Sequence, residues 1–153
     1  MENKIKFMKK ALDLAKKSAK EGEIPIGAVI VKDGKVIATG RNTRNKTKIA
    51  TKHAEVVAIE RACKKLKDWR LEGAEMFVTV EPCPMCAGAI LNSRIKKLYF
   101  GAYEKKSGAV LSNHRLLFLG ALNHQVEVEG GVLESECSAL LKEFFVLARK
   151  RQE

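Results

Sequence analysis

Apolar residues recur every three or four positions at the start of the chain, with lysines between them: Ile5, Met8, Leu12, Ala15 and Ala19. This spacing predicts an amphipathic helix with one buried face. A run of apolar and β-branched residues follows at 26–31, and Asp33-Gly34 separates it from a second run at 35–39. An Asp-Gly pair between two such runs is a strong signal for a two-residue turn, so these residues are predicted to form a β-hairpin.

After the hairpin, segments with strand composition alternate with segments of helical periodicity. The order strand, helix, strand predicts a parallel pair of strands joined by a right-handed crossover. Residues 41–52 are polar and basic without a hydrophobic period, which predicts a loop, and residues 108–122 are predicted to be a loop with a short helix in it. The other predicted elements are helices at 54–67, at 84–93 and from 134 onward, and strands at 76–80, 95–101 and 125–128.

Together these elements predict an α/β fold. An antiparallel hairpin extended by parallel strands gives a mixed five-stranded sheet, and helices on both faces complete a three-layer α/β/α sandwich. The length of 153 residues predicts a single domain, residues 1–153. The periodicity of the last helix predicts an inward face with five members: Cys137, Leu140, Leu141, Phe144 and Leu147.

The charge of the chain points to a class of partner. Its 29 Lys and Arg residues outnumber 18 Asp and Glu residues, which gives a formal net charge of +11, and five of the cations lie in the predicted loop at 41–52. A basic excess of this size favours a polyanionic partner, most simply a nucleic acid. A lysine-rich surface that is only solvated is the alternative interpretation.

No secretory or membrane segment is predicted. The chain opens with an amphipathic stretch and not with a signal peptide, and no apolar run reaches the ~20 residues of a membrane span. Cys63, Cys83, Cys86 and Cys137 could pair as disulfides on number alone. Metal-bound thiolates in a reducing cytoplasm are the interpretation that we favour.

Cys83 and Cys86 belong to the strongest chemical motif, together with a His-Ala-Glu sequence at His53 to Glu55. Two cysteines three apart, on a helix that begins at Pro84, point to one side, and the helix N-terminus favours their thiolates. At the start of its own helix, His53 can reach a metal while Glu55 reaches the water on that metal. Three ligands with an open fourth position make up a catalytic zinc site. Zinc lowers the pKa of bound water toward ~7, and a nearby carboxylate can move the proton to a leaving amine.

A structural zinc site with four protein ligands is the alternative. It would recruit Cys63 or Cys137, but both lie on the apolar stripes of predicted helices, where a buried free cysteine is the default. A Cys-x-x-Cys pair by itself could also be a redox motif. His114 and His124 have no ligand-like spacing to the cluster and stay unassigned.

The signature His-x-Glu followed by Pro-Cys-x-x-Cys is that of zinc-dependent nucleobase deaminases. Beyond this signature, nearly the whole chain resembles the bacterial tRNA-specific adenosine deaminases. The segments that carry the resemblance are 24–29, 40–42, 81–95, 100–102, 122–124 and 136–145. The last two matter most, because cytidine and guanine deaminases generally lack them.

The resemblance implies the cytidine-deaminase fold, a homodimer, and conversion of adenosine to inosine at the wobble position of an arginine tRNA with anticodon ACG. It implies one zinc ion per subunit, bound by His53, Cys83 and Cys86, with Glu55 as the proton shuttle. Asn42 would bind the flipped base in a pocket lined by Ile26 and Ala28. The resemblance assigns contacts with the rest of the anticodon stem-loop to Arg44, Glu104, Asn123, Phe145 and Arg149.

Three segments depart from the family pattern. Residues 49–52 read Ile-Ala-Thr-Lys where Asp-Pro-Thr-Ala is usual, Tyr103-Glu104 stands where an aspartate is usual, and residues 110–114 contain less glycine than expected. These departures concern how an RNA loop is bound, since none of them changes the zinc motif.

Two other functions stay open. A deaminase of free bases or nucleosides, such as guanine or cytosine, would use the same zinc motif, but a small neutral substrate gives no reason for a net charge of +11. A non-catalytic RNA-binding module stabilised by zinc, or an inactive partner subunit, would be expected to lack Glu55. The motif alone does not distinguish adenine from cytosine as the substrate base.

Overall fold

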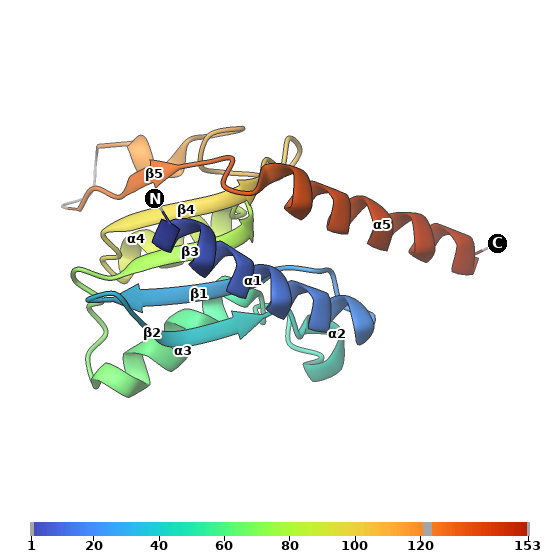
Figure 1. The fold of residues 1–153 in the computed structure, drawn as a ribbon. Coiled ribbons are helices and arrows are strands. Elements are labelled where there is room, and N and C mark those ends of the chain that lie inside the picture. Colours follow the sequence, from blue (N-terminus) through green and yellow to red (C-terminus); the bar gives the residue numbers. More distant parts are fainter. Residues whose placement is uncertain (1, 121–123, 153) are drawn as a thin grey trace.

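Five strands form one mixed sheet in the computed structural model, which describes residues 2–120 and 124–152 (Figure 1). The strand order is β2-β1-β3-β4-β5. β1 pairs antiparallel with β2 and with β3, whereas the β3–β4 and β4–β5 pairs are parallel. This confirms the predicted hairpin and its parallel extension. The strands are β1 Gly27–Lys32, β2 Lys35–Arg41, β3 Glu75–Val80, β4 Lys97–Ala102 and β5 Glu127–Glu129.

The helices confirm the predicted order of elements. They are α1 Glu2–Lys20, α2 Arg44–Thr47, α3 Ala54–Leu66, α4 Pro84–Asn92, the 3-10 turn η1 Leu116–Phe118, and α5 Glu134–Gln152. The short helix α2 lies in the segment predicted to be a loop. A residue far away in the sequence stabilises this helix. The buried carboxylate of Glu23 accepts hydrogen bonds from the backbone N–H groups of Asn45 and Lys46, at 2.9 and 2.8 Å.

The helices pack in two layers, one on each face of the sheet (Figure 1). On one face, side chains of α3 and α4 form a cluster with Ala28 and Ile30 of β1. On the other face, side chains of α1 and α5 form a second cluster with Val29 and Val31. Alternate residues of one strand thus enter opposite layers, as the two-residue period of a strand requires. The three-layer α/β/α architecture was correctly predicted.

Two glycines of the hairpin allow helices to approach the sheet closely. A Cβ atom built on Gly40 of β2 would lie 2.2 Å from the carbonyl oxygen of Ala54 and 2.7 Å from the backbone nitrogen of Ala58, both in α3. A Cβ atom on Gly27 of β1 would lie 2.1 Å from the carbonyl oxygen of Ala11 in α1. The backbone of each helix therefore lies directly against a strand, which fixes the start of α3 relative to the sheet.

The second half of α5 differs from the prediction. Cys137 is buried as expected, but Leu147 is 47% exposed, and the end of the helix extends past the sheet (Figure 1). The predicted inward position of Leu147 is therefore wrong. The cause is length: a helix of 19 residues spans about 28 Å, whereas a six-residue strand spans about 20 Å. Periodicity identifies an apolar face, but it does not show where the partner of that face ends.

Within residues 2–120 and 124–152, no helix has the length and apolar character that crossing a membrane requires.

The contact at Gly40 gives the first prediction. Gly40→Ala is expected to lower the free energy of unfolding by about 1–3 kcal/mol, because overpacking displaces α3 from β2. Thermal unfolding should then occur roughly 2–12 °C lower. Gly88→Ala is the matched control, since a Cβ there meets nothing within 4 Å, and the change in a helix is expected to be neutral or stabilising. Equal unfolding temperatures for the Gly40→Ala variant and the original chain would contradict the argument.

Candidate metal centre and substrate cavity

Two helices begin at the same edge of the sheet, and each presents potential metal ligands there. His53 occupies the N-cap position of α3, and Cys83 occupies that of α4, which continues through Pro84 to Cys86. Neither N-cap side chain makes a capping hydrogen bond to its own helix within the described part of the chain. Both side chains are therefore free to point past the helix ends.

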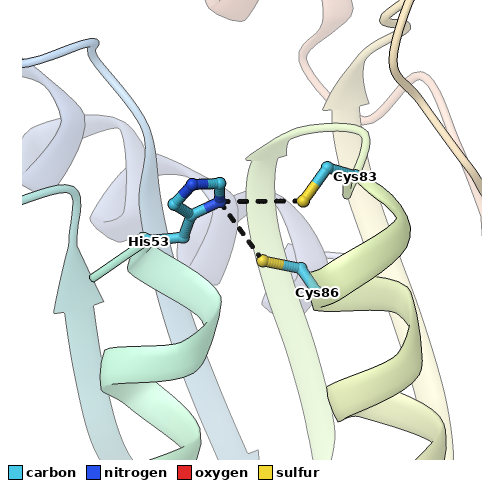
Figure 2. Close-up of side chains that lie close together, drawn as sticks. All are labelled: His53, Cys83 and Cys86. Carbon is cyan, nitrogen blue, oxygen red and sulfur yellow. Dashed lines mark hydrogen bonds between the residues drawn. The ribbon is translucent and has the colours of Figure 1, made fainter. Parts of the chain in front are cut away.

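The three predicted ligands meet in space. Nδ1 of His53 lies 3.7 Å from Sγ of Cys83 and 3.5 Å from Sγ of Cys86, and Figure 2 shows the imidazole facing both sulfur atoms. All three candidate ligand atoms lie within 4.8 Å of one another. The structure therefore brings together residues that are 30 and 33 positions apart in the chain.

Glu55 stands in the first turn of α3, next to this cluster. Its side chain is buried, and its Oε1 atom has no hydrogen-bond partner among the described residues. A buried acceptor without a partner costs free energy, so it calls for an explanation. A water molecule on a metal held by the three ligands would supply the missing donor. One nitrogen and two sulfur ligands fit zinc, which leaves a fourth position for water in its catalytic sites.

The electrostatics of the cluster suit metal binding and proton transfer. Burial raises the pKa of Glu55 to about 7, so this carboxyl can gain and lose a proton near neutral pH. The pKa of Cys83 is lowered to about 4, chiefly by a hydrogen bond from the Cys86 thiol. Burial raises this pKa, but the interaction with His53 lowers it further. The same hydrogen bond and burial raise the pKa of Cys86. A metal ion would replace the shared proton, because metal binding requires both thiolates.

The other cysteines and histidines do not complete a four-ligand site among the described residues. The cluster that could hold a metal has three members there. Cys137 is buried with the side chains of α1, on the face of the sheet opposite to α3 and α4. Cys63 lies toward the other end of α3, with its Sγ 3.7 Å from the carbonyl oxygen of Trp69. Nε2 of His124 lies 2.7 Å from the carbonyl oxygen of Ile95.

A cavity of about 280 Å³ opens beside the cluster. Besides His53, Cys83 and Glu55, five of the predicted site residues line it: Ile26, Asn42, Arg44, Glu104 and Phe145. Ala28 does not line the cavity, which corrects that prediction. Its side chain is fully buried in the core cluster shared with α3, on the side of β1 that α3 and α4 cover. Arg149 lies farther along α5 and does not line the cavity either, and Asn123 lies outside the described residues.

Asn42 is held in one orientation at the cavity wall. Its Oδ1 atom accepts a hydrogen bond from the backbone N–H of Arg44 at 3.1 Å, and its own backbone N–H donates to the carbonyl oxygen of Ile26 at 3.2 Å. The side chain is only 5% exposed. Because Oδ1 is occupied, the Nδ2 amide group is the donor that the side chain can offer to a ligand.

Glu81 organises another part of the cavity wall. Its buried carboxylate accepts hydrogen bonds from the backbone N–H groups of Glu104, Val110, Leu111 and Ser112, at 3.1, 3.2, 2.7 and 2.8 Å, and from the Ser112 hydroxyl. Burial alone would raise the pKa of Glu81, but these hydrogen bonds outweigh it and lower the pKa. One side chain thereby fixes the loop that carries Glu104 to the cavity.

Comparison with known proteins places this chain in a family. A family model for MafB19-like deaminases matches residues 2–149. The chain is 48% identical over 147 residues to the tRNA-specific adenosine deaminase of Bacillus subtilis, which covers 96% of this chain and 91% of that protein. The chain belongs to the tRNA-specific adenosine deaminase family. It is therefore an enzyme, a hydrolytic deaminase.

Solved structures agree with this placement. The deaminase matches a structure from a study of A-to-I editing by tRNA:A34 deaminases at the wobble position of transfer RNA, with a TM-score of 0.86 and 44% identity over 88% of this chain and 98% of that chain. It also matches a guanine deaminase from Bacillus subtilis, with a TM-score of 0.62 and 44% identity over 64% of this chain and 63% of that one. The predicted cytidine-deaminase type of fold is thus confirmed.

The sequence analysis did not predict several residues that line the deaminase cavity. Ile24, Val80, Ser107 and Leu141 line it as well. Leu141 was predicted only as a core residue of the last helix, and Ser107 lies in a loop without any motif. The role of Glu81 was also missed, although its place beside Pro82 and Cys83, where a strand runs into the motif, could have suggested it.

The loop anchored by Glu81 gives the second prediction. Glu81→Ala is expected to lower kcat/KM of the deaminase roughly 10–100-fold, because five donors lose their acceptor and the cavity wall shifts. Metal content should not change, and trypsin should cleave after Lys105 or Lys106 more readily. Glu81→Gln keeps one acceptor oxygen, so its kcat/KM should lie between those of the original enzyme and of the Glu81→Ala variant. Glu72→Ala, at an exposed glutamate, is the control, and an unaltered kcat/KM in the Glu81→Ala variant would refute the role.

Proposed function

We propose that this enzyme hydrolytically deaminates adenosine to inosine at the wobble position of a tRNA anticodon, with the ACG anticodon of an arginine tRNA as the substrate. One observation carries the proposal: the cluster of His53, Cys83 and Cys86 stands with the buried Glu55 beside a cavity, in a chain that is 48% identical to a tRNA-specific adenosine deaminase. The cavity, at about 280 Å³, is near the lower limit for ligand pockets and suits a single flipped base.

His53, Cys83 and Cys86 would hold one zinc ion per chain. Zinc would supply Lewis acidity that activates water at neutral pH. Glu55 would take a proton from the attacking water and deliver it to N1 of the adenine while the water oxygen bonds to C6, which becomes tetrahedral. Glu55 would then transfer the second proton to the amino group, which departs as ammonia when the C6–N6 bond breaks. The product is inosine.

The cavity walls would hold the base and the adjoining backbone. Asn42 would donate a hydrogen bond from Nδ2 to the flipped base, and Ile26 would pack against its face. Arg44 at the rim would meet a phosphate, while Phe145, which is 45% exposed, would contact a neighbouring base. These roles, like those of Glu104, Asn123 and Arg149 toward the anticodon stem-loop, stay predictions.

We also propose a homodimer that acts on tRNA in the cytoplasm, as a single deaminase domain. The support is the family to which the chain belongs and the tRNA substrate that the family name implies.

Deamination of free guanine is the second candidate, and one observation favours it. The guanine deaminase from Bacillus subtilis shares 44% identity over 64% of this chain. The net charge of +11 argues against it, because a neutral base gains nothing from a basic surface. The two candidates therefore differ in substrate size and charge and not in the reaction.

The third prediction tests the proposed function directly. Zinc-loaded protein is expected to form inosine at the first anticodon base of a stem-loop that carries ACG, and to leave free adenosine, cytidine and guanine unchanged. Inosine is measured by mass spectrometry after nuclease digestion. Turnover of guanine with an intact stem-loop would overturn the tRNA assignment and keep the metal chemistry.

A variant of Glu55 separates chemistry from metal binding. Glu55→Ala is expected to lower kcat by at least about 10²–10⁴-fold, because the proton transfers lose their carrier. Zinc content should stay at one ion per chain, since Glu55 is not a ligand. Turnover near that of the original enzyme would refute the mechanism. Cys63→Ala is the control, because Cys63 lies outside the cluster and should affect neither zinc content nor turnover.

The fourth prediction uses salt to separate a polyanionic from a neutral substrate. If the exposed cations Arg44, Lys46 and Lys48 each neutralise one phosphate, kcat/KM for the stem-loop should fall about 20-fold between about 50 and 200 mM salt. Lys48→Ala should lower the slope of log kcat/KM against log salt by about 0.7. Lys64→Ala, toward the far end of α3, should leave the slope unchanged. A flat profile would count against RNA as the substrate.

A further inference from the structure

The short helix α2 keeps its position without a buried side chain of its own. None of its four residues is buried, and residues 44–51 are all exposed. The backbone N–H of Thr43 donates to the carbonyl oxygen of Lys52 at 3.1 Å, so residues 43–52 leave the body of the protein and return to it at one place. A helix of one turn is not stable by itself, so contacts with the rest of the chain must hold α2.

The decisive contacts come from Glu23. The N-cap residue of α2, Thr43, makes no capping hydrogen bond with its side chain. Instead the two carboxylate oxygens of Glu23 accept hydrogen bonds from the backbone N–H groups of Asn45 and Lys46, at 2.9 and 2.8 Å. The first N–H groups of a helix have no partner inside it, and an N-cap side chain usually accepts from them. Glu23 supplies this acceptor from 22 residues away.

Glu23 is itself fixed at the end of α1. It is only 1% exposed, and its backbone N–H donates to the carbonyl oxygen of Ser18 at 2.9 Å. The hydroxyl of the buried Ser18 donates in turn to the carbonyl oxygen of Asn42 at 3.0 Å. Figure 1 shows α2 next to the last turns of α1. The end of α1 therefore holds both Asn42 and the helix that follows it.

This network joins the deaminase cavity to the exposed cations of α2 and its flank. Asn42 and Arg44 line the cavity, whereas Lys46 and Lys48 are exposed on the same short segment outside it. Glu23 does not line the cavity. The position of these cations relative to the cavity is thus set by a carboxylate that lies behind the wall.

We propose that Glu23 is a positioning residue for RNA recognition. It holds α2 in advance, so that Arg44, Lys46 and Lys48 meet the phosphates of the RNA loop whose target base enters the cavity. This inference rests on the proposed function and adds the residue that orders its RNA-binding rim. Ordering a segment during binding costs affinity, and a segment that is already ordered avoids this cost. A free base gains nothing from it, because Lys46 and Lys48 do not line the cavity.

The fifth prediction separates binding from chemistry. Glu23→Ala is expected to raise KM for the anticodon stem-loop roughly tenfold with kcat little changed, because the RNA must then order α2 itself. Glu23→Gln keeps one acceptor oxygen, so its KM should lie between those of the original enzyme and of Glu23→Ala. Glu72→Ala, which removes an exposed carboxylate before β3 begins, is the control and should leave both constants unchanged.

A double-mutant cycle tests whether Glu23 acts through the cations. In the original enzyme, Lys48→Ala should raise KM because a phosphate contact is lost. In the Glu23→Ala variant the same substitution should raise KM by a smaller factor, because the position of Lys48 is no longer fixed. A general loss of stability in Glu23→Ala would leave the factor for Lys48→Ala unchanged, since the effects of independent sites add.

Limited proteolysis tests the anchor without any substrate. Trypsin can cleave after the exposed residues Arg44, Lys46 and Lys48 once the segment leaves its folded position. Glu23→Ala should be cleaved there roughly tenfold faster or more, the effect of losing about one hydrogen bond to a charged group. An unchanged zinc content of the variant checks that the metal centre is intact.

The outcomes separate this inference from the proposed function. If the original enzyme forms inosine and Glu23→Ala leaves KM unchanged or lowers only kcat, Glu23 does not position the RNA-binding rim. If Glu23→Ala does not fold, the same criteria apply to Glu23→Gln. Equal cleavage of variant and original chain by trypsin would overturn the anchoring of α2. Absence of inosine with the original enzyme would instead refute the proposed function, and faster cleavage of Glu23→Ala would still identify the anchor.

Discussion

The convergence of two helix N-termini at one edge of the sheet is the constraint on which the site depends. Three ligand atoms from segments 30 or more residues apart must lie within 4.8 Å of one another. β3 and β4 are parallel, so β3 delivers Cys83 to the edge where their carboxyl ends lie, the usual ligand side of such sheets. His53 reaches the same edge because α3 contacts β2 at Gly40, next to Ala54 in its first turn. A shift of α3 by one side-chain diameter would move His53 and Glu55 together away from the cysteines.

Three buried glutamates surround the site, and their hydrogen bonds distinguish their roles. Glu23 accepts from backbone N–H groups of α2, and Glu81 accepts from four backbone N–H groups and a hydroxyl. Both are structural, since a buried carboxylate that is saturated with fixed donors has no capacity left for a substrate. Glu55 is equally buried, yet its Oε1 has no partner among the described residues. Burial alone would not separate Glu55, the proposed proton carrier, from the two carboxylates that support the walls.

The sequence could predict what depends on local pattern. Asp33 and Gly34 both have positive φ angles, 51° and 74°, so the turn predicted from the Asp-Gly pair has the backbone that such a turn requires. The three candidate metal ligands were correctly predicted to meet, because their spacing encodes two helix starts. Contacts between residues far apart in the sequence could not be predicted from local pattern. Glu23 stabilises α2, and Glu81 fixes the loop that carries Ser107 to the cavity. Ala28 was misplaced because the pattern of apolar residues does not show which positions of β1 are covered by the core and which border the cavity.

The residues that select the substrate base must lie outside the candidate metal centre, because deaminases of this fold act on different bases. Two features border the cavity here, the basic segment 41–52 and α5. In the basic segment, Arg41 pairs with Glu21 and Lys52 with Glu60, whereas Arg44, Lys46 and Lys48 have no ion pair within the described residues. Arg44 lines the cavity, Lys46 and Lys48 are exposed in the same segment, and α5 adds the ring of Phe145 to the cavity wall. A free base in the cavity would reach neither Lys46 nor Lys48, whereas a splayed RNA loop can contact the cavity and these cations at once, so the walls and not the chemistry favour a macromolecular substrate.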